Sequence, residues 1–141
     1  MRRILLIEDE PILRELMTCL LRDLDCHVLH ASSQTELERL SAEPFDAAVV
    51  DLSVLKPMPE MLVQRLKDNP EQPQVILCSA STSLLELAKH MGCMSLAKPF
   101  SIDDFSEVVG GALEIRARRQ DRLIGWGLGQ NLAAHYSRSW E

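Results

Sequence analysis

Four ionisable side chains that are far apart in the sequence each follow a short apolar run: Glu8, Asp9, Asp51 and Lys98. Carboxylates that lie close together repel one another unless a cation sits among them. Mg²⁺ suits such a cluster because it takes oxygen ligands and usually retains several waters and phosphate oxygens. A lysine beside the ion is a natural partner for a phosphoryl group. These residue types therefore predict phosphoryl transfer onto a carboxylate.

The apolar runs before these residues have the character of buried strands. They are continuous rather than alternating, as expected when both faces of a parallel sheet are covered, and they predict strands over residues 3–7, 26–31, 45–51, 74–79 and 93–97. Segments with helical spacing predict helices over residues 11–24, 34–40, 59–67, 84–91 and 102–119. This alternation predicts a doubly wound α/β fold with a five-stranded parallel sheet. The carboxyl ends of parallel strands meet in one crevice, so we expect the four side chains to converge.

Composition and length are those of an ordinary globular domain. The chain has 141 residues, 46% of them hydrophobic and 26% charged. No apolar stretch approaches the roughly 20 residues of a membrane-spanning helix. The first apolar run stops at Glu8, too soon for a signal peptide, so a cytoplasmic location is expected. The four cysteines lack metal-ligand spacing and are expected to be reduced thiols.

The charge distribution argues against nucleic acid as the main partner. The formal net charge is −6, and most of the acidic residues precede residue 112. Four arginines near the end of the last predicted helix form a small basic patch: Arg116, Arg118, Arg119 and Arg122. Cations at a helix C-terminus commonly complement the helix dipole, and that reading is preferred here.

Four signals at the predicted strand ends together resemble the receiver domain of bacterial two-component response regulators, of the single-domain, chemotaxis-regulator type. The resemblance covers about residues 2–119. The signals are Glu8-Asp9 after the first strand, Asp51 ending the third, Ser79-Ala80 ending the fourth and Lys98-Pro99-Phe100 after the fifth. Singly, each has an ordinary alternative, such as a helix cap or a turn residue. Jointly, they imply the flavodoxin-like (βα)5 receiver fold.

The resemblance implies a role for each of these positions in phosphoryl transfer. Asp51 would be the acceptor, taking a phosphoryl group from the phosphohistidine of a sensor histidine kinase or a phosphotransfer protein. Asp9 and Asp51 would bind Mg²⁺ directly, together with the backbone carbonyl of Ser53, and Glu8 would act through a bound water. Such transfer depends mainly on positioning and charge neutralisation.

Further implications concern the phosphoryl oxygens and the turn after the fifth strand. Lys98 would neutralise one phosphoryl oxygen, and Ser79 would donate its hydroxyl to another. The resemblance also implies a cis peptide bond before Pro99.

Two departures from the receiver pattern affect how a signal would be transmitted. Most receivers have Met-Pro three and four residues after the acceptor, where this chain has Val54 and Leu55. Receivers usually carry Tyr or Phe three residues before the conserved lysine, where this chain has Ser95. The usual aromatic switch is missing, so activation is expected to be transmitted differently or only weakly.

A change of character near residue 120 predicts a domain boundary, with the receiver at 1–119 and a tail at 120–141. Three alternating glycines, Gly125, Gly127 and Gly129, predict a hinge. An amphipathic helix should follow, marked by Leu128, Leu132, Tyr136 and Trp140. We expect this helix to pack on its own domain or on a second copy of the chain. Packing on a second copy would give a homodimer through the tail or last helix. A partner protein is the next alternative, and a membrane surface is the least favoured.

The sequence thus predicts a response regulator that accepts a phosphoryl group on Asp51. Only about 22 residues follow the predicted receiver, too few for a helix-turn-helix domain, so output is expected through contact with a downstream protein or through onward transfer. The domain would not be an enzyme beyond self-phosphorylation and self-dephosphorylation. The alternative is a receiver-like binding module that acts independently of phosphorylation. A hydrolase of the haloacid dehalogenase type is disfavoured, because Ser53 stands where those enzymes carry a second Asp.

Overall fold

The protein forms an α/β domain in which strands and helices alternate strictly along the chain. The computed structural model describes the backbone of residues 1–135 and the side chains of residues 1–122. The elements in chain order are β1 (Arg2–Ile7), α1 (Pro11–Asp23), β2 (Cys26–Ala31), α2 (Gln34–Leu40), β3 (Ala47–Asp51), the 3₁₀ helix η1 (Leu52–Leu55), α3 (Pro59–Lys67), β4 (Gln74–Ser79), α4 (Thr82–His90), β5 (Met94–Ala97) and α5 (Ile102–His135).

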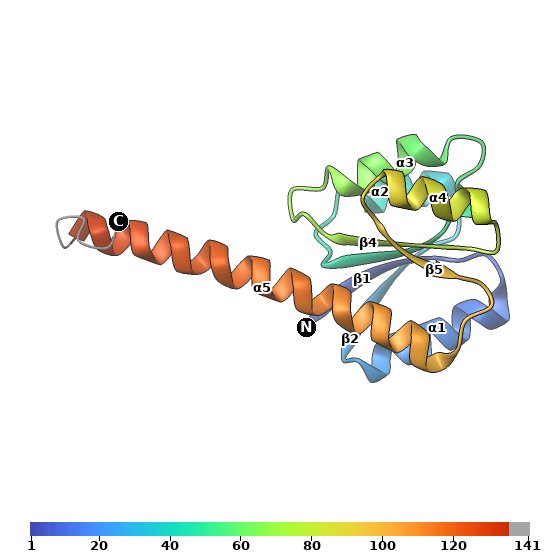
Figure 1. Ribbon diagram of the computed structural model, residues 1–141, viewed down its shortest axis with the longest axis horizontal. Helices are drawn as coiled ribbons and strands as arrows, with labels where there is room; N and C mark the ends of the chain where they lie inside the picture. The colour runs from blue at the N-terminus through green and yellow to red at the C-terminus, as the bar shows by residue number, and fades with distance from the viewer. Residues whose placement is uncertain (136–141) are drawn as a thin grey trace.

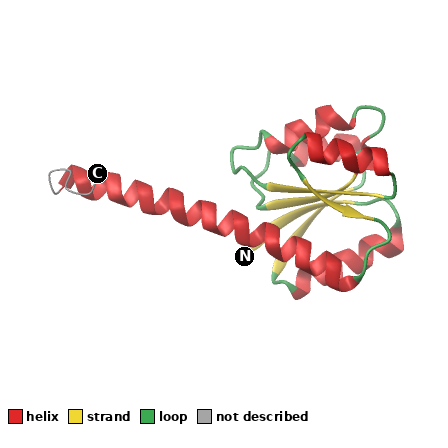
Figure 2. Ribbon diagram, in the orientation of Figure 1, coloured by secondary structure: helices red, strands yellow, loops and turns green. Residues whose placement is uncertain are grey.

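The five strands make one parallel sheet in the order β2-β1-β3-β4-β5. Helices α1 and α5 cover one face, and α2, α3 and α4 cover the other (Figure 1; Figure 2). Each face has its own buried cluster, which explains why the central strands β1, β3 and β4 are largely apolar. The predicted doubly wound, flavodoxin-like fold is confirmed. The predicted bounds of the strands agree with the structure to within two residues.

Local signals fix where the helices begin. Pro11 occupies the first turn of α1, and the Glu10 carboxylate accepts hydrogen bonds from the backbone N–H groups of Ile12 (3.2 Å) and Leu13 (2.6 Å). Ser81 caps α4 by accepting from the N–H of Leu84 at 3.4 Å. These caps set the helices immediately after the strand ends, so the loops that carry the polar side chains are short.

The structure has a continuous helix, α5, where the sequence predicted a hinge. This helix packs on the sheet through Phe105 and Val109, then continues as a single helix through the glycine-containing segment to His135. Glycine costs about 1 kcal/mol per residue relative to alanine within a helix. That cost does not break the described backbone, because the segment holds no proline and Ala, Leu, Ile and Gln surround the glycines. The predicted boundary near residue 120 stays a prediction, and Tyr136 and Trp140 lie outside the described residues.

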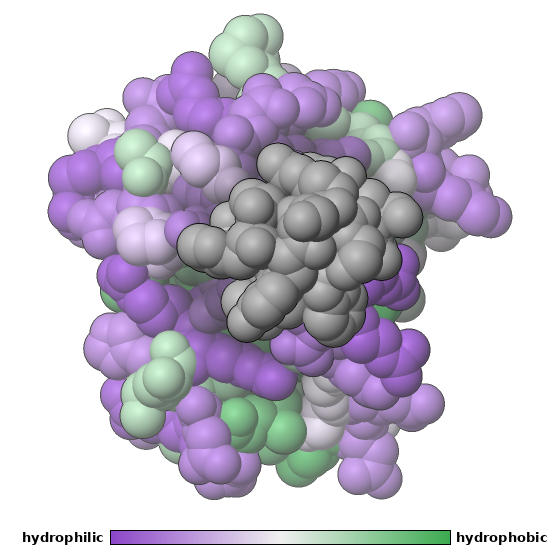
Figure 3. Space-filling view, turned by 90° about the vertical axis from the view of Figure 1, so that its left-hand side faces the viewer, coloured by the Kyte–Doolittle hydropathy of each residue, from purple (hydrophilic) through white to green (hydrophobic). Residues whose placement is uncertain are grey.

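The point where α5 leaves the sheet is held by a buried arginine. Arg116 is 6% exposed, and its guanidinium lies 3.0 Å from the Glu71 carboxylate and 3.8 Å from that of Asp46. Beyond this point α5 extends away from the domain (Figure 1). The surface around its exit is mostly hydrophilic (Figure 3). No helix in the described part of the chain has both the length and the apolar character needed to cross a membrane.

Candidate functional site

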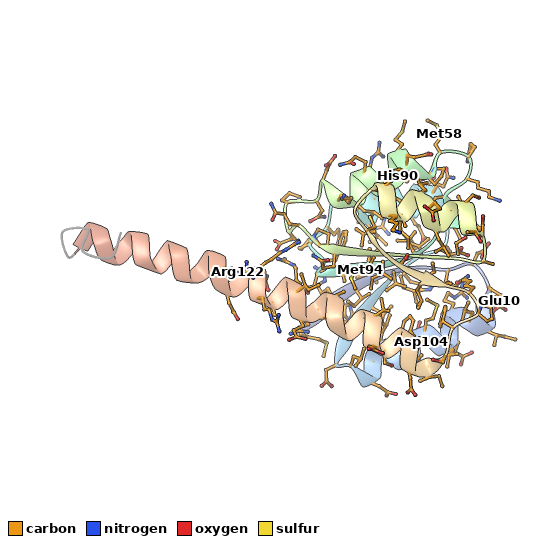
Figure 4. All side chains as sticks on the ribbon, viewed as in Figure 1. Glu10, Met58, His90, Met94, Asp104 and Arg122 are labelled. Atoms are coloured by element: carbon orange, nitrogen blue, oxygen red, sulfur yellow. The ribbon has the colours of Figure 1, made fainter. Side chains whose placement is uncertain are left out.

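Three carboxylates meet at the carboxyl ends of the adjacent strands β1 and β3. Glu8 and Asp51 are buried, at 1% and 5% exposure, whereas Asp9 is exposed. One oxygen from each lies within 4.8 Å of the other two, a spacing suitable for a shared metal ion. The strand ends that the sequence predicted to converge do converge. Glu10, which follows the pair, lies at the side of the domain opposite Arg122, so this site and the projecting part of α5 are at opposite ends (Figure 4).

Lys98 supplies the positive charge of the cluster. Its Nζ donates to Glu8 Oε1 at 2.7 Å and lies 3.2 Å from Asp51 Oδ2. Burial alone would lower the pKa of Lys98, but the hydrogen bond to Glu8 and the charge of Asp51 raise it above its ordinary value. Burial raises the pKa of the Glu8 carboxyl, and the bond to Lys98 opposes that shift. The ammonium group therefore stays charged at neutral pH and joins both buried carboxylates.

Asp51 is oriented by the first residues of η1. Its Oδ1 accepts from the Ser53 N–H at 3.1 Å, and its Oδ2 accepts from the Ser53 hydroxyl at 2.9 Å. Leu52 and Leu55 of the same turn are fully buried, so they anchor the segment in the core. Leu55, one of the two departures after the acceptor position, is thus a packing residue, and the sequence alone did not show this.

Ser79 and Lys98 lie on neighbouring strand ends. The Ser79 hydroxyl is buried and accepts from the Ser81 N–H at 2.9 Å, which leaves its own hydrogen free to donate. The Ser79 carbonyl accepts from the Lys98 N–H at 2.9 Å. The peptide bond between Lys98 and Pro99 is cis, as the resemblance implied. Ser81, and not Ser79, is the helix cap, so the ordinary explanation for Ser79 does not hold.

Sequence reasoning missed two features of this end of the sheet. Glu10 directly follows the acidic pair in the sequence and caps α1, a role that Pro11 could have indicated. Ile12 and Leu16 belong to the apolar stripe of α1, yet they are 78% and 41% exposed. Leu16 lines an apolar pocket of about 380 Å³ beside Lys98, together with Leu13, Ala80, Pro99 and Phe100.

Cys78 is the register partner of Asp51 on β4, and it gives a prediction about thiol reactivity. It is fully buried, and burial raises its pKa to about 12, so almost no thiolate forms at pH 8. Native protein treated with iodoacetamide at pH 8 should be alkylated at the exposed Cys19, and Cys78 should react only after denaturation. Peptide mass spectrometry measures both sites. Rapid native alkylation of Cys78 would contradict the packing of β4.

The family assignment follows from comparison with known domains. The model of the response regulator receiver domain matches residues 4–110, which include both acidic loop residues, Asp51, Ser79 and Lys98. The chain belongs to this family. It is a receiver domain of the kind found in two-component signalling, with a phosphorylatable aspartate site. The comparison with curated proteins finds no match.

Solved receiver structures share the fold. A CheY-like receiver domain protein from Methanospirillum hungatei JF-1 is 18% identical with a TM-score of 0.73, over 84% of this chain and 98% of that one. The receiver domain of a sensor histidine kinase from Pseudomonas aeruginosa PAO1, with magnesium coordinated in its active-site cleft, is 19% identical with a TM-score of 0.69, over 80% and 98%. A response regulator from Burkholderia pseudomallei, with a phosphorylated aspartic acid, calcium and citrate, is 19% identical with a TM-score of 0.66, over 99% and 88%. At these identities the likeness shows the fold alone.

Proposed function

We propose that this receiver accepts a phosphoryl group on Asp51 from the phosphohistidine of a histidine kinase or phosphotransfer protein. The observation that carries the proposal is the position of Lys98 Nζ, 3.2 Å from the Asp51 carboxylate, with Glu8 and Asp9 close by. A carboxylate is a weak nucleophile toward a phosphoryl group that already bears negative charge. The cluster offers both a metal site and an ammonium group to neutralise that charge.

Each residue of the site has a distinct part in the proposed reaction. Asp9 and Asp51 would hold Mg²⁺ directly, with the Ser53 carbonyl as a third protein ligand, and Glu8 would contact the ion through water. The acidic groups present fit this ion, since all of them offer oxygen atoms. Bound Mg²⁺ would draw the transferred phosphoryl group toward Asp51 and offset the repulsion between the carboxylates.

Two further groups would hold the phosphoryl product. Lys98 already donates toward Asp51 and would shift its hydrogen bond to a phosphoryl oxygen. Ser79 has a free hydroxyl hydrogen at the neighbouring strand end and would donate it to a second oxygen. The oxygen of Asp51 forms the new bond to phosphorus as the bond from phosphorus to the donor's imidazole nitrogen breaks.

The test is phosphorylation by acetyl phosphate, a small donor that needs no partner protein. Intact mass spectrometry should show the addition of one phosphoryl group in the presence of Mg²⁺ and none after removal of divalent ions. A sample with Ca²⁺ in place of Mg²⁺ is the control for the ion. A known receiver treated in the same way is the control for the donor. If the known receiver is modified and this chain is not, the phosphoacceptor proposal fails.

The apolar surface around Leu16 is the proposed contact for the protein donor. Leu16 lies on the pocket that Lys98 also lines, so a helix docked there would bring its histidine close to Asp51. Leu16→Glu should reduce transfer from a phosphorylated protein donor by about 10-fold or more, since a charge at a helix-docking surface costs at least about 1.4 kcal/mol. Acetyl phosphate labelling should be unchanged. Met61→Glu, at a methionine on α3 that is 52% exposed against 41% for Leu16, is the matched control.

A phosphorylation-independent binding module is the second candidate. Ser95 on β5 is exposed and offers no aromatic ring that could turn inward when Ser79 binds a phosphoryl group. Output would then come from constitutive contacts, and failure of the acetyl phosphate test would favour this reading. Under either candidate, output is through contact with a downstream protein, and a homodimer through α5 or the tail is one form of such contact.

A cytoplasmic location is part of the proposed function. The four free thiols support it, since disulfides are rare in the cytosol.

A further inference from the structure

A second polar depression lies away from the phosphoacceptor site, between α1 and the edge strand β2. It has a volume of about 400 Å³. Its walls include Arg14, Cys19 and Arg22 from α1 and His30 from β2. We call this the α1–β2 groove. Neither the acidic cluster nor Lys98 lines it, so its chemistry is separate from phosphoryl transfer.

The arginines of the groove have no charge partner among the described side chains. Arg116 and Arg118 on α5, Arg65 on α3 and Arg3 on β1 all form ion pairs. Arg14 and Arg22, by contrast, have no carboxylate within ion-pair distance in the part of the chain described. Four other described arginines, Arg2, Arg39, Arg119 and Arg122, also lack an ion pair, but Arg14 and Arg22 are the two that share one wall of this depression. Arginine is the side chain best suited to bind carboxylate and phosphate groups, because its planar fork donates two parallel hydrogen bonds.

His30 brings a buried polar atom to the side of the groove. Its Nε2 atom is buried and finds no hydrogen-bond partner among the described residues. Buried polar atoms are nearly always satisfied by protein, water or a bound ligand. Burial lowers the pKa of His30, the Arg14 charge acts in the same direction and the Glu36 carboxylate opposes it, so the ring is mainly neutral at pH 7. A neutral ring can place its one N–H on Nε2, and a turn of the ring toward the groove would let a bound oxyanion accept from it.

Nearby carboxylates do not cancel this positive character. Glu15 is the one acidic side chain that lines the groove, against two arginines. Glu36, which faces His30 from α2, accepts hydrogen bonds from the N–H and hydroxyl of Ser32 at 3.0 and 3.4 Å. The groove therefore keeps an excess of donors and positive charge.

We propose that the α1–β2 groove binds a small anion carrying phosphate or carboxylate groups, held by Arg14, Arg22 and His30. The size of the groove suits a small metabolite rather than a macromolecule, since ligand pockets for small molecules occupy about 300–1,000 Å³. The receiver would then respond to a bound anion as well as to phosphorylation, through a surface separate from the phosphoacceptor site.

Cys19 is a built-in reporter for the test. It is exposed and lines the groove, whereas Cys93, half-buried near α4, lies outside it. The wild-type protein, freed of metal ions in a buffer without chelator, is alkylated with iodoacetamide at increasing inorganic phosphate or succinate, with NaCl at matched ionic strength. Peptide mass spectrometry follows both cysteines. Cys19 alkylation should slow several-fold and saturably, with half-effect at a ligand concentration on the order of 1 mM, the weak end of specific binding. Cys93 alkylation should not change.

Variants locate the binding site. Protection of Cys19 should be lost in the double variant Arg14→Gln/Arg22→Gln. It should persist in Arg39→Gln, which removes an exposed arginine of α2 outside the groove. If the double variant unfolds at a lower temperature, Arg22→Gln alone, a change to an exposed side chain, makes the comparison.

Comparison of phosphate with succinate shows which chemical class of anion the groove binds. Protection by phosphate alone assigns the groove to phosphorylated ligands, and protection by succinate alone assigns it to carboxylates. The nuclear magnetic resonance signals of the His30 ring should move along with protection. The proposal is overturned if neither probe protects Cys19 beyond the NaCl control at about 10 mM, roughly ten times the expected dissociation constant. It is equally overturned if protection survives the loss of both arginines.

Discussion

Asp51→Asn is expected to abolish the Mg²⁺-dependent gain of one phosphoryl group from acetyl phosphate. The substitution keeps the shape of the side chain, and its amide oxygen can still accept a hydrogen bond from Ser53. It removes the nucleophilic carboxylate oxygen and one of the three acidic groups at the metal site. Intact mass spectrometry measures the result directly, and a wild-type sample run in parallel shows that the donor is active.

The control for this prediction is a carboxylate that does not belong to the site. Asp46→Asn alters a partly buried aspartate at the opposite ends of the strands, where it accepts from the Arg3 N–H at 2.8 Å. It should lower stability and leave phosphorylation in place. Phosphoryl gain in Asp51→Asn would show that another residue is the acceptor, and peptide mapping of the modified protein would then identify it.

Lys98→Met is expected both to destabilise the fold and to reduce phosphorylation strongly. Removal of the ammonium leaves Glu8, which is 1% exposed, with an uncompensated buried charge next to Asp51. Loss of one partner of a buried pair costs about 3–5 kcal/mol. Because 19% of the Lys98 side chain is exposed, we expect a fall of roughly 3 kcal/mol in the free energy of unfolding, at the low end of that range. Urea denaturation in metal-free buffer measures it.

A double variant separates the two effects of losing Lys98. Glu8→Gln/Lys98→Met removes one of the two buried carboxylate charges that Lys98 compensates, and Asp51 keeps its hydrogen bonds from Ser53, so the double variant should recover part of the lost stability. Phosphorylation should stay low in the double variant, because the cation that faces the phosphoryl group is still absent. If Lys98→Met alone is as stable as the wild type, the ion pair seen at 2.7 Å contributes little to the fold.

Much of the fold and of the site could be predicted from the sequence, because both depend on local signals. Continuous apolar runs, Pro11 at the start of α1 and serine caps determine where strands and helices begin. Strict alternation of the two element types then requires a parallel sheet. A parallel sheet places its strand ends together, so the convergence of Asp9, Asp51 and Lys98 follows from their positions after three strands.

The sequence was less informative about which side chains are buried. The helical period of α1 predicted the helix, but it did not show that Ile12 and Leu16 stay exposed. The sequence did not show that the Glu10 carboxylate, next to the acidic pair, would cap the N-terminus of α1. The glycines after residue 120 predicted a hinge, whereas the described backbone of α5 is continuous to His135. Exposure and helix continuity depend on what packs against an element, and periodicity does not record that.

The sequence by itself determined the order of the elements, the receiver family and the residues that meet at the phosphoacceptor site, since each is written in a local pattern. Only the tertiary structure decided that Glu8 is buried and joined to Lys98, which lies 90 residues away. The same is true of the groove where Arg14 and Arg22 face His30. Such contacts form between segments without any shared motif, because their distances are set by how helices pack on the sheet.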